Sequence, residues 1–364
     1  MPAPHEGGHT GPPLHGVRVL DFTRLLPGAY ATLLLADLGA DVIKIEDPRG
    51  GDGMRDLPTR GRLDYFALLN RNKRSVTLDL RSPDAASVLD ALLPKSDVAV
   101  DSFRPSTARR LGVDGQTLRA RHPRLICASM TGFGLNGPYV ERAAHDINYQ
   151  ALAGTLTPPG LPGPLVADIG SAMRTVIGVL AALLQRQQTG EGRVVDVSIH
   201  EAALAWTMFP STADLANACY NLYETSDGQW LALGALESKF WAGFCERIGR
   251  PDLTALQHAQ GDERTRVLSA VRDIIRLRTR EEWLARFAGA DVCLTPVHSL
   301  DEASADPHAQ ARGIVMRDRG ITFITPPQHD VRPAPALGAD TDAVLEDAGI
   351  DRTARERLRN RRVI

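Results

Sequence analysis

The segment that decides the fold reads GVRVLDF at positions 16–22 and DVIKIE at 41–46, with an apolar stretch at 29–38 between them. The two outer runs have the β-branched composition of strands, and the stretch between them has the length and composition of a helix. Gly39 stands at the position where a helix commonly ends. The segment therefore predicts a β-α-β unit, with parallel strands and a right-handed crossover.

The same alternation continues down the chain. Further strand-like runs lie at 75–80, 97–101, 125–130 and 193–199, and helical patterns lie at 82–93, from 106 onward and at 170–186. Repeated strand-helix alternation predicts an α/β fold with a doubly wound parallel sheet. Ligands of such sheets bind at the carboxyl ends of the strands, so the loops there are the first place to look for a site.

The pattern changes after residue 206. Residues 221–233 predict two strands joined by an Asp-Gly hairpin turn, and helical patterns follow at 239–248, 262–278 and 279–287. We therefore expect a flexible leader over 1–13, a large Rossmann-like domain over 14–206 that is completed by 311–364, and a smaller α+β domain over 207–310.

Composition narrows the class of protein. The chain has 364 residues, a formal net charge of −2, and four scattered cysteines without metal-ligand spacing. This balance argues against nucleic acid or an anionic membrane surface as partner, and the cysteines argue against a structural zinc site or a disulfide framework. The N-terminus lacks the apolar core of a signal peptide, and the longest apolar stretch predicts a buried helix. A cytoplasmic location is the expectation.

Three titratable residues are candidates for acid-base chemistry. His145 opens the segment HDINY, Asp168 precedes a long helical pattern, and Glu237 follows an apolar strand-like run. A histidine and a carboxyl group of matched pKa can move a proton on a carbon acid, and backbone N–H groups at the helix start after Asp168 are candidate donors to the resulting enolate. Each residue alone has a simpler interpretation: a solvent contact for His145, a helix N-cap for Asp168 and a surface carboxylate for Glu237.

The chain resembles the class III CoA-transferase (CaiB/BaiF) family over nearly its whole length. The matching motifs are GVRVLD at 16–21, LGADVIKIE at 38–46, NKRS at 72–75, SFRP at 102–105, SMTGFG at 129–134, TPV at 295–297 and DPH at 306–308. The resemblance implies CoA thioester substrates, no prosthetic group, and a homodimer of two interlocked ring-like chains.

Two activities of the family fit the candidate residues. The segment HDINY with GALE at 234–237 is most similar to the α-methylacyl-CoA racemase branch. In that branch, residues matching His145 and Asp168 are opposed acid and base, and one matching Glu237 orients the histidine. In the CoA-transferase branch, the residue matching Asp168 is a nucleophile, and no histidine is needed. Racemisation of 2-methylacyl-CoA is therefore the first hypothesis, CoA transfer between carboxylic acids the second, and a non-catalytic CoA-thioester-binding protein the third.

The resemblance also indicates residues for the CoA moiety. The cations expected near its phosphates are Arg104, Arg110, Lys73, Arg74 and Arg81, and the residues expected along the thioester tunnel are Thr131, Gly132 and Phe133. Asp47 is a departure, because relatives often carry an adenine-side arginine at this position.

Overall fold

The computed structural model describes residues 11–57, 64–313, 315–318, 321–324 and 331–364. The chain divides into a first unit, Met1–Met208 with Arg312–Ile364, and a second unit, Phe209–Ala311. From the sequence we placed these boundaries after residues 206 and 310.

A six-stranded sheet forms the centre of the first unit, and all its neighbouring strands are parallel. Its order is β3-β2-β1-β4-β5-β6. The strands are β1 (Arg18–Asp21), β2 (Asp41–Glu46), β3 (Arg74–Thr77), β4 (Val98–Asp101), β5 (Ile126–Thr131) and β6 (Val194–Ser198). The predicted α/β class with a parallel sheet is confirmed.

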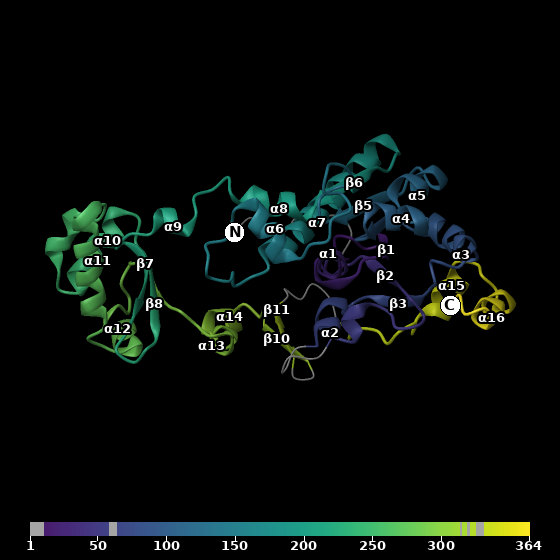
Figure 1. Ribbon diagram of the computed structural model, residues 1–364. Coiled ribbons are helices and arrows are strands. Elements are labelled where there is room, and N and C mark those ends of the chain that lie inside the picture. The colour runs from purple at the N-terminus through teal and green to yellow at the C-terminus, as the bar shows by residue number, and fades with distance from the viewer. Residues whose placement is uncertain (1–10, 58–63, 314, 319–320, 325–330) are drawn as a thin grey trace. The chain divides into compact units, whose positions relative to one another are not determined.

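One face of the sheet is covered by α1 (Leu25–Asp37) and α7 (Val166–Thr189) (Figure 1). Val19, Val42 and Val98 point toward these helices and are fully buried. Among the described residues, α7 alone has the length and composition of a membrane span, and half of that stretch is buried in the protein. A core helix of a folded domain passes the same test.

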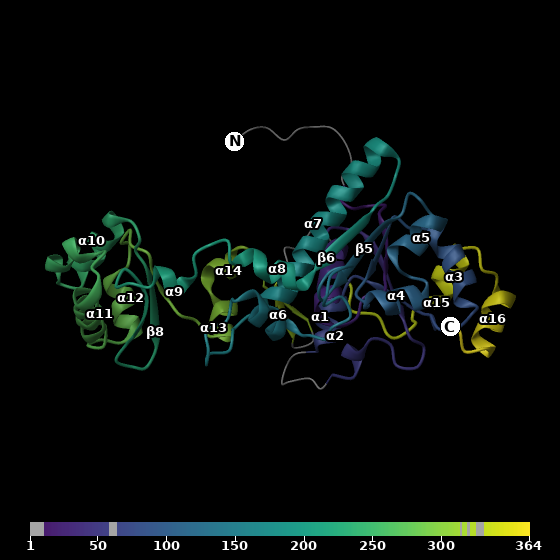
Figure 2. The same cartoon turned by 45° about the horizontal axis from the view of Figure 1, so that its top comes forward.

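The opposite face carries Leu20, Ile43 and Ala99, because neighbouring residues of a strand point to opposite sides. The helices on this side are α3 (Ala85–Leu92), α4 (Pro105–Leu111), α5 (Gly115–Arg121) and α15 (Thr341–Asp347). Figure 2 shows α7 on one side of the sheet and α4 and α5 on the other. The strands are therefore buried on both faces, which leaves their carboxyl edge for polar chemistry.

Shorter elements complete the first unit. They are η1 (Gly53–Arg55), α2 (Tyr65–Asn70), η2 (Leu93–Lys95), α6 (Asp146–Ala153), α8 (Ile199–Trp206), the antiparallel pair β10 (Val315–Asp318) and β11 (Ile321–Ile324), and α16 (Arg352–Asn360).

Part of the predicted leader belongs to the folded unit. Residues 1–10 lie outside the described residues, but Leu14 is buried and its N–H donates to Leu38 O at 2.9 Å. Gly39 has φ +97°, and a Cβ there would lie 2.4 Å from Pro12 Cβ. The prediction of a flexible leader is thus wrong for 11–13, because Pro12 packs against the glycine that ends α1.

The second unit has an antiparallel sheet of β7 (Tyr220–Glu224), β8 (Trp230–Gly234) and β9 (Leu294–Pro296). Its helices are α9 (Thr212–Leu215), α10 (Ser238–Arg247), η3 (Pro251–Leu256), α11 (Gly261–Ile275), α12 (Arg280–Arg286), α13 (Leu300–Ala305) and α14 (Pro307–Ala311). Trp241, Phe244 and Phe287 stack in its core. The predicted hairpin is present, with Gly228 at φ +71° in its turn.

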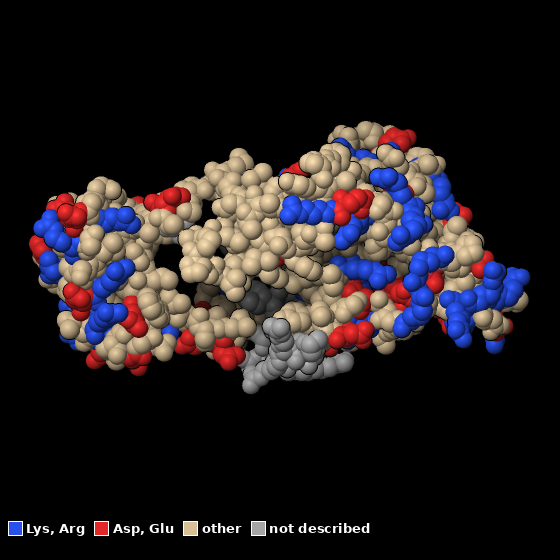
Figure 3. All heavy atoms as spheres, viewed as in Figure 1, with Lys and Arg blue, Asp and Glu red and all other residues tan. Residues whose placement is uncertain are grey.

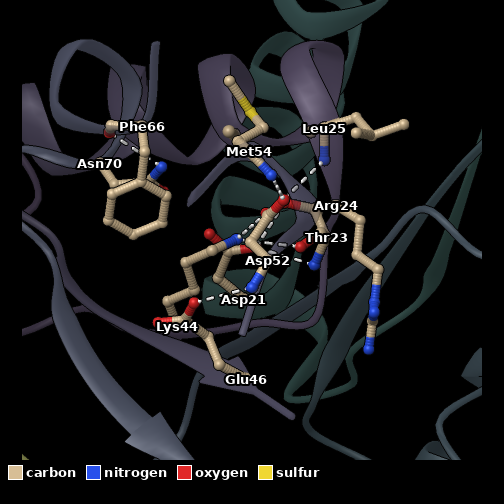
Figure 4. Close-up of polar contacts among 12 residues, drawn as sticks. Asp21, Thr23, Arg24, Leu25, Lys44, Glu46, Asp52, Met54, Phe66 and Asn70 are labelled. Atoms are coloured by element: carbon tan, nitrogen blue, oxygen red, sulfur yellow. Dashed lines mark hydrogen bonds and ion pairs between the residues drawn. The ribbon is translucent and has the colours of Figure 1, made fainter. Parts of the chain in front are cut away.

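A buried polar network holds the carboxyl ends of β1 and β2 together (Figure 4). Lys44 Nζ lies 2.8 Å from Asp52 Oδ2 and donates to Thr23 O at 3.0 Å. Lys73 Nζ lies 3.2 Å from Asp21 Oδ2. Burial by itself would raise the pKa of Asp21, but the charges of the two lysines, with hydrogen bonds from Thr23 and Thr32, outweigh it and hold that pKa at about 2. Burial lowers the pKa of Lys73 to about 8, so this lysine is still mostly charged at neutral pH, and the four groups are enclosed away from solvent.

We expect Lys44→Met to lower the free energy of unfolding by ~3–5 kcal/mol, because the substitution leaves Asp21 and Asp52 buried without this cation. Urea denaturation measures the effect. The control is Arg352→Met, which breaks the exposed ion pair with Glu356 and should change the same free energy by no more than about 1 kcal/mol. A loss of less than about 1 kcal/mol for Lys44→Met would show that the network is not what holds these strand ends.

Candidate functional site

The loop after β5 packs against α6 at the carboxyl edge of the sheet. A Cβ on Gly132 would lie 2.5 Å from Tyr149 Oη, so a larger residue there would displace the tyrosine ring. The Phe133 ring lies 5.3 Å from that of Tyr149 and 5.7 Å from that of His200. Thr131 is buried, and no described residue forms a hydrogen bond with its Oγ1. These contacts bring Thr131, Gly132 and Phe133 beside α6.

Asp146 joins α6 to α7. Its carboxylate is buried, and Oδ1 accepts the backbone N–H groups of Ala167 at 2.9 Å and Asp168 at 3.0 Å. Gln150 Nε2, one turn further along α6, donates to Oδ2 at 2.5 Å. Residue 165 at the N-cap of α7 is a leucine, which offers no side-chain acceptor. Asp146 therefore supplies the cap that α7 lacks in its own sequence.

His145 is the N-cap residue of α6 and directly precedes Asp146. Its N–H donates to Asn148 Oδ1 at 3.0 Å, which fixes the backbone, while its side chain is exposed. Asp146 is thus bonded to the backbone of Asp168 on one side and covalently linked to His145 on the other. The structure brings these two sequence-predicted residues to the starts of two adjoining helices.

Asp168 has an unusual electrostatic environment. Burial, together with the charge of Asp146, raises the pKa of its carboxyl group to about 7. A helix N-terminus ordinarily favours the anion, but here Asp146 already occupies that end of α7. Near neutral pH Asp168 is therefore present both as acid and as carboxylate, which suits a group that must give and take a proton.

The predicted enolate donors at the start of α7 are not free. The N–H groups of Ala167 and Asp168 are bonded to Asp146, and that of Ile169 donates to Leu165 O at 3.0 Å. The expectation that these groups stabilise an enolate oxygen is wrong, because the capping carboxylate already fills the first turn.

Glu237 lies in the second unit, where it is the exposed N-cap residue of α10. Its backbone C=O accepts the N–H of Phe240 at 3.0 Å. A contact between Glu237 and His145 would join the two units, so it stays a prediction.

Arg104 is exposed at the N-cap of α4, after β4. Burial and the charge of Asp168 raise the pKa of Tyr149 to about 12, and Arg104 acts in the opposite direction. The three groups thus influence one another electrostatically. Tyr149 stays a neutral donor, and its Oη donates to Ala144 O at 3.2 Å.

A cavity of about 260 Å³ lies at the carboxyl ends of β2, β3 and β4. Its apolar lining includes Ile45, Leu78 and Phe103, and its charged lining includes the predicted Arg81 and Arg110. Apolar walls with a few convergent charges are typical of a small-molecule site. Its place in the sheet agrees with the rule for open α/β folds.

The prediction that Lys73 and Arg74 lie near the CoA phosphates is wrong. Lys73 is fully buried, and its Nζ donates to Asp21, to Thr32 Oγ1 at 2.8 Å and to Asn70 Oδ1 at 2.9 Å. Arg74 begins β3 at the amino edge of the sheet and forms two bonds to Asp41. Neither cation can reach a ligand at the carboxyl edge of the sheet. Arg74 is separated from that edge by the length of β3, and Lys73 is enclosed by the residues packed around it.

Asp101 is a titratable group that the sequence reasoning missed. It ends β4, and its carboxyl accepts Ser129 Oγ at 2.7 Å and the N–H of Phe103 at 3.1 Å. Burial raises the pKa of Asp101 to about 7, although both of these hydrogen bonds act to lower it. It faces a cavity of about 330 Å³. Its position at the end of a predicted strand was the feature of the sequence that could have identified it.

Among the described residues, no group of three or more His, Cys, Asp or Glu side chains is arranged to hold a metal ion.

Comparisons with known proteins agree with this architecture. The family that is described as "CoA-transferase family III" matches this chain over residues 14–341. The human alpha-methylacyl-CoA racemase is 30% identical over 391 residues, covering 96% of this chain and 97% of that protein. The beta subunit of succinyl-CoA–L-malate CoA-transferase from Chloroflexus aurantiacus is 32% identical over 405 residues, covering 99% and 100%.

Solved structures are similar as well. The protein Rv3272 of Mycobacterium tuberculosis has a TM-score of 0.80 at 30% identity, covering 92% of this chain and 100% of its own. A CAIB/BAIF family protein from Brucella suis has a TM-score of 0.79 at 28% identity, covering 93% and 100%.

Asp168→Asn should stabilise the protein increasingly as pH rises. With a native pKa of about 7 and an ordinary value of 3.8, the folded state holds a proton that the unfolded state has lost, so Asp168 costs stability as pH rises through this window. Melting temperatures should show a difference in favour of the variant that grows between about pH 4 and 7 and then levels off. A difference independent of pH would refute the raised pKa.

Asp146→Asn should shift to lower pH the range over which Asp168 costs stability. The amide oxygen still accepts the N–H groups of Ala167 and Asp168, but the charge that raises the pKa of Asp168 is gone. Melting curves of Asp146→Asn with and without Asp168→Asn give the shift. The control is Asp351→Asn, which neutralises the N-cap of α16 and should leave the window where it is. An unshifted window in Asp146→Asn would contradict the role of this charge.

Proposed function

Because the chain belongs to CoA-transferase family III, we propose that it acts on CoA thioesters and racemises 2-methylacyl-CoA by proton transfer between His145 and Asp168. The observation that supports this most is the carboxyl group of Asp168, whose pKa of about 7 lies near that of an ordinary histidine. A carboxyl group whose pKa is near neutrality can act as the acid in one direction and as the base in the other, as a reversible reaction requires.

In the proposed reaction His145 removes the α-proton on one face of the substrate. The electron pair moves onto the thioester oxygen, and the carboxylic acid of Asp168 delivers a proton to the opposite face. The product has the inverted configuration, with His145 protonated and Asp168 ionised. The reverse reaction uses the same groups in exchanged roles, and no prosthetic group takes part. Glu237 is proposed to hold the imidazole and stabilise its protonated form.

We propose that the CoA moiety lies along the carboxyl edge of the sheet. The adenine would occupy the cavity between Ile45, Leu78 and Phe103, with the diphosphate near Arg110 in the cavity lining and Arg104 at the start of α4. The loop of Thr131, Gly132 and Phe133 then adjoins the thioester.

CoA transfer between carboxylic acids is the second candidate. Relatives with this activity are 32% identical, similar to the 30% of the human racemase. In that reaction the Asp168 carboxylate attacks the thioester carbonyl, forms an acyl anhydride and releases the CoA thiolate. The thiolate then attacks the Asp168 carbonyl of the anhydride, which releases the donor acid as a carboxylate and leaves a CoA thioester on Asp168. An acceptor carboxylate takes the CoA by the same two steps in reverse and regenerates the Asp168 carboxylate. With a pKa of about 7, Asp168 is partly ionised near neutral pH and could serve either reaction. What favours proton transfer is His145, a residue that the transferase mechanism does not need.

A second copy of the chain is the proposed partner. Met173, Ile177 and Leu184 form an apolar stripe on α7, with exposed fractions of 44%, 66% and 63%. Figure 3 shows a surface almost without charged side chains over α6 and α8. Large exposed apolar patches are typical of interfaces, which supports the homodimer implied by the family.

The test is deuterium incorporation from D2O into the α-carbon of a 2-methylacyl-CoA. The wild type should exchange the α-proton, and His145→Ala should lose at least ~100-fold in rate, because general acid-base groups contribute typically 10²–10⁴-fold. Cys293→Ser, which changes an exposed cysteine, serves as the control.

A wild type that exchanges no deuterium, but forms a trappable thioester on Asp168 in the presence of an acceptor acid, would assign the transferase activity instead. Binding of acyl-CoA without either reaction would assign the non-catalytic role.

A further inference from the structure

The sequence contains the same three-residue turn after two paired strands. Asp47 and Arg49 follow β2, and Asp79 and Arg81 follow β3, with one residue between the acid and the base in each pair. Each carboxylate accepts the backbone N–H of its own arginine at 3.1 Å. Each also accepts the Nε–H of that arginine, at 3.0 Å in the first turn and 2.8 Å in the second. Since β2 and β3 are neighbours, the two turns lie side by side.

The two turns are bonded across to each other. Arg81 Nη2 donates to Asp47 Oδ2 at 2.6 Å, and Arg49 Nη2 donates to Asp79 Oδ2 at 3.3 Å. The four side chains form a closed ring of alternating charge, which we call the Asp-Arg ring. A lone exposed ion pair contributes little, but here Arg49 binds Asp47 bidentately and Arg81 bridges Asp79 and Asp47, and a network of this kind fixes the guanidinium groups in space.

The ring presents its arginines to solvent. The side chains of Arg49 and Arg81 are 60% and 53% exposed, against 22% and 19% for Asp47 and Asp79. Asp47 already accepts four N–H groups, so its oxygens have no capacity for a ligand. Each arginine keeps N–H groups at Nη1 that no carboxylate of the ring accepts. The ring is therefore built to donate hydrogen bonds to an anion, although half of its members are acids.

The position of the ring along the sheet indicates which anionic group of the ligand would reach it. Sheet order places β5, near Asp168, three strand spacings from β2 and four from β3, which is ~14–19 Å at ~4.8 Å per strand. In a CoA thioester the reacting carbon is followed by the pantetheine arm, the diphosphate and the adenosine 3′-phosphate. Arg110, after β4, lies between the two ends. The ring is at the end of the row, where the last of these groups arrives.

We infer that the Asp-Arg ring binds the ribose 3′-phosphate and makes the protein selective for CoA over 3′-dephospho-CoA. The inference rests on the proposed function, because it assumes a CoA thioester as ligand. It assigns Asp47 a positioning role: the acid at this position holds Arg49 and Arg81 toward the phosphate. Simple charge repulsion predicts the opposite, namely that an acid here weakens binding of a phosphate.

The test is calorimetric titration of the full-length protein with CoA and with 3′-dephospho-CoA. The wild type should bind CoA ~10-fold more tightly, as expected for a few charge-assisted hydrogen bonds. Arg49→Gln should remove most of this preference without affecting folding, because its side chain is exposed. Asp47→Asn should weaken CoA binding and leave dephospho-CoA binding unchanged. The control is Asp347→Asn, which neutralises a carboxylate paired with Arg18 at the amino edge of the same sheet and should preserve the preference.

Tighter CoA binding by Asp47→Asn would overturn the inference in favour of repulsion. Equal affinity of the wild type for both ligands would also overturn it, while the binding itself would still support a CoA-dependent function. Absence of binding for both ligands would remove the proposed function together with the inference.

Discussion

The carboxylate of Asp146 is the interaction on which the candidate site depends. It closes the first turn of α7 through the N–H groups of Ala167 and Asp168, and it begins α6 immediately after His145. One buried side chain thus sets the position of two candidate catalytic residues. The same charge also helps to raise the pKa of Asp168 to about 7, after the larger effect of burial. One capping carboxylate thus contributes both to the geometry and to the acidity of this site.

The parallel sheet arranges the rest along one edge. Our proposals place the reaction at the end of β5 and at α6 and α7, the diphosphate at the end of β4, and the ribose phosphate at the ends of β2 and β3. This order follows the strand order β3-β2-β1-β4-β5, so that an extended ligand can lie across the strand ends. Polar groups collect there because the faces of the sheet are buried under helices on both sides.

Not every charge near this edge binds a ligand. Lys44 and Lys73 are enclosed with Asp21 and Asp52, where breaking a pair costs far more than an exposed ion pair contributes. Asp47 shows the converse: it is an acid in the region where we propose that a phosphate binds, and its bonds to Arg49 and Arg81 hold both guanidinium groups in place. The sign of a side chain is therefore less informative than the partners it already has.

The sequence by itself determined the α/β class, the β-α-β start, the hairpin of the second unit and the family, because strand and helix periodicities and ordered motifs are local properties of the chain. It also identified His145 and Asp168 as candidates. Only the tertiary structure decided that Lys73 and Arg74 are unavailable, that Asp146 caps α7 from another helix, and that two separate Asp-x-Arg turns close into one ring. Burial, pKa and hydrogen-bond partners depend on residues distant in sequence, and folding alone brings those residues into contact.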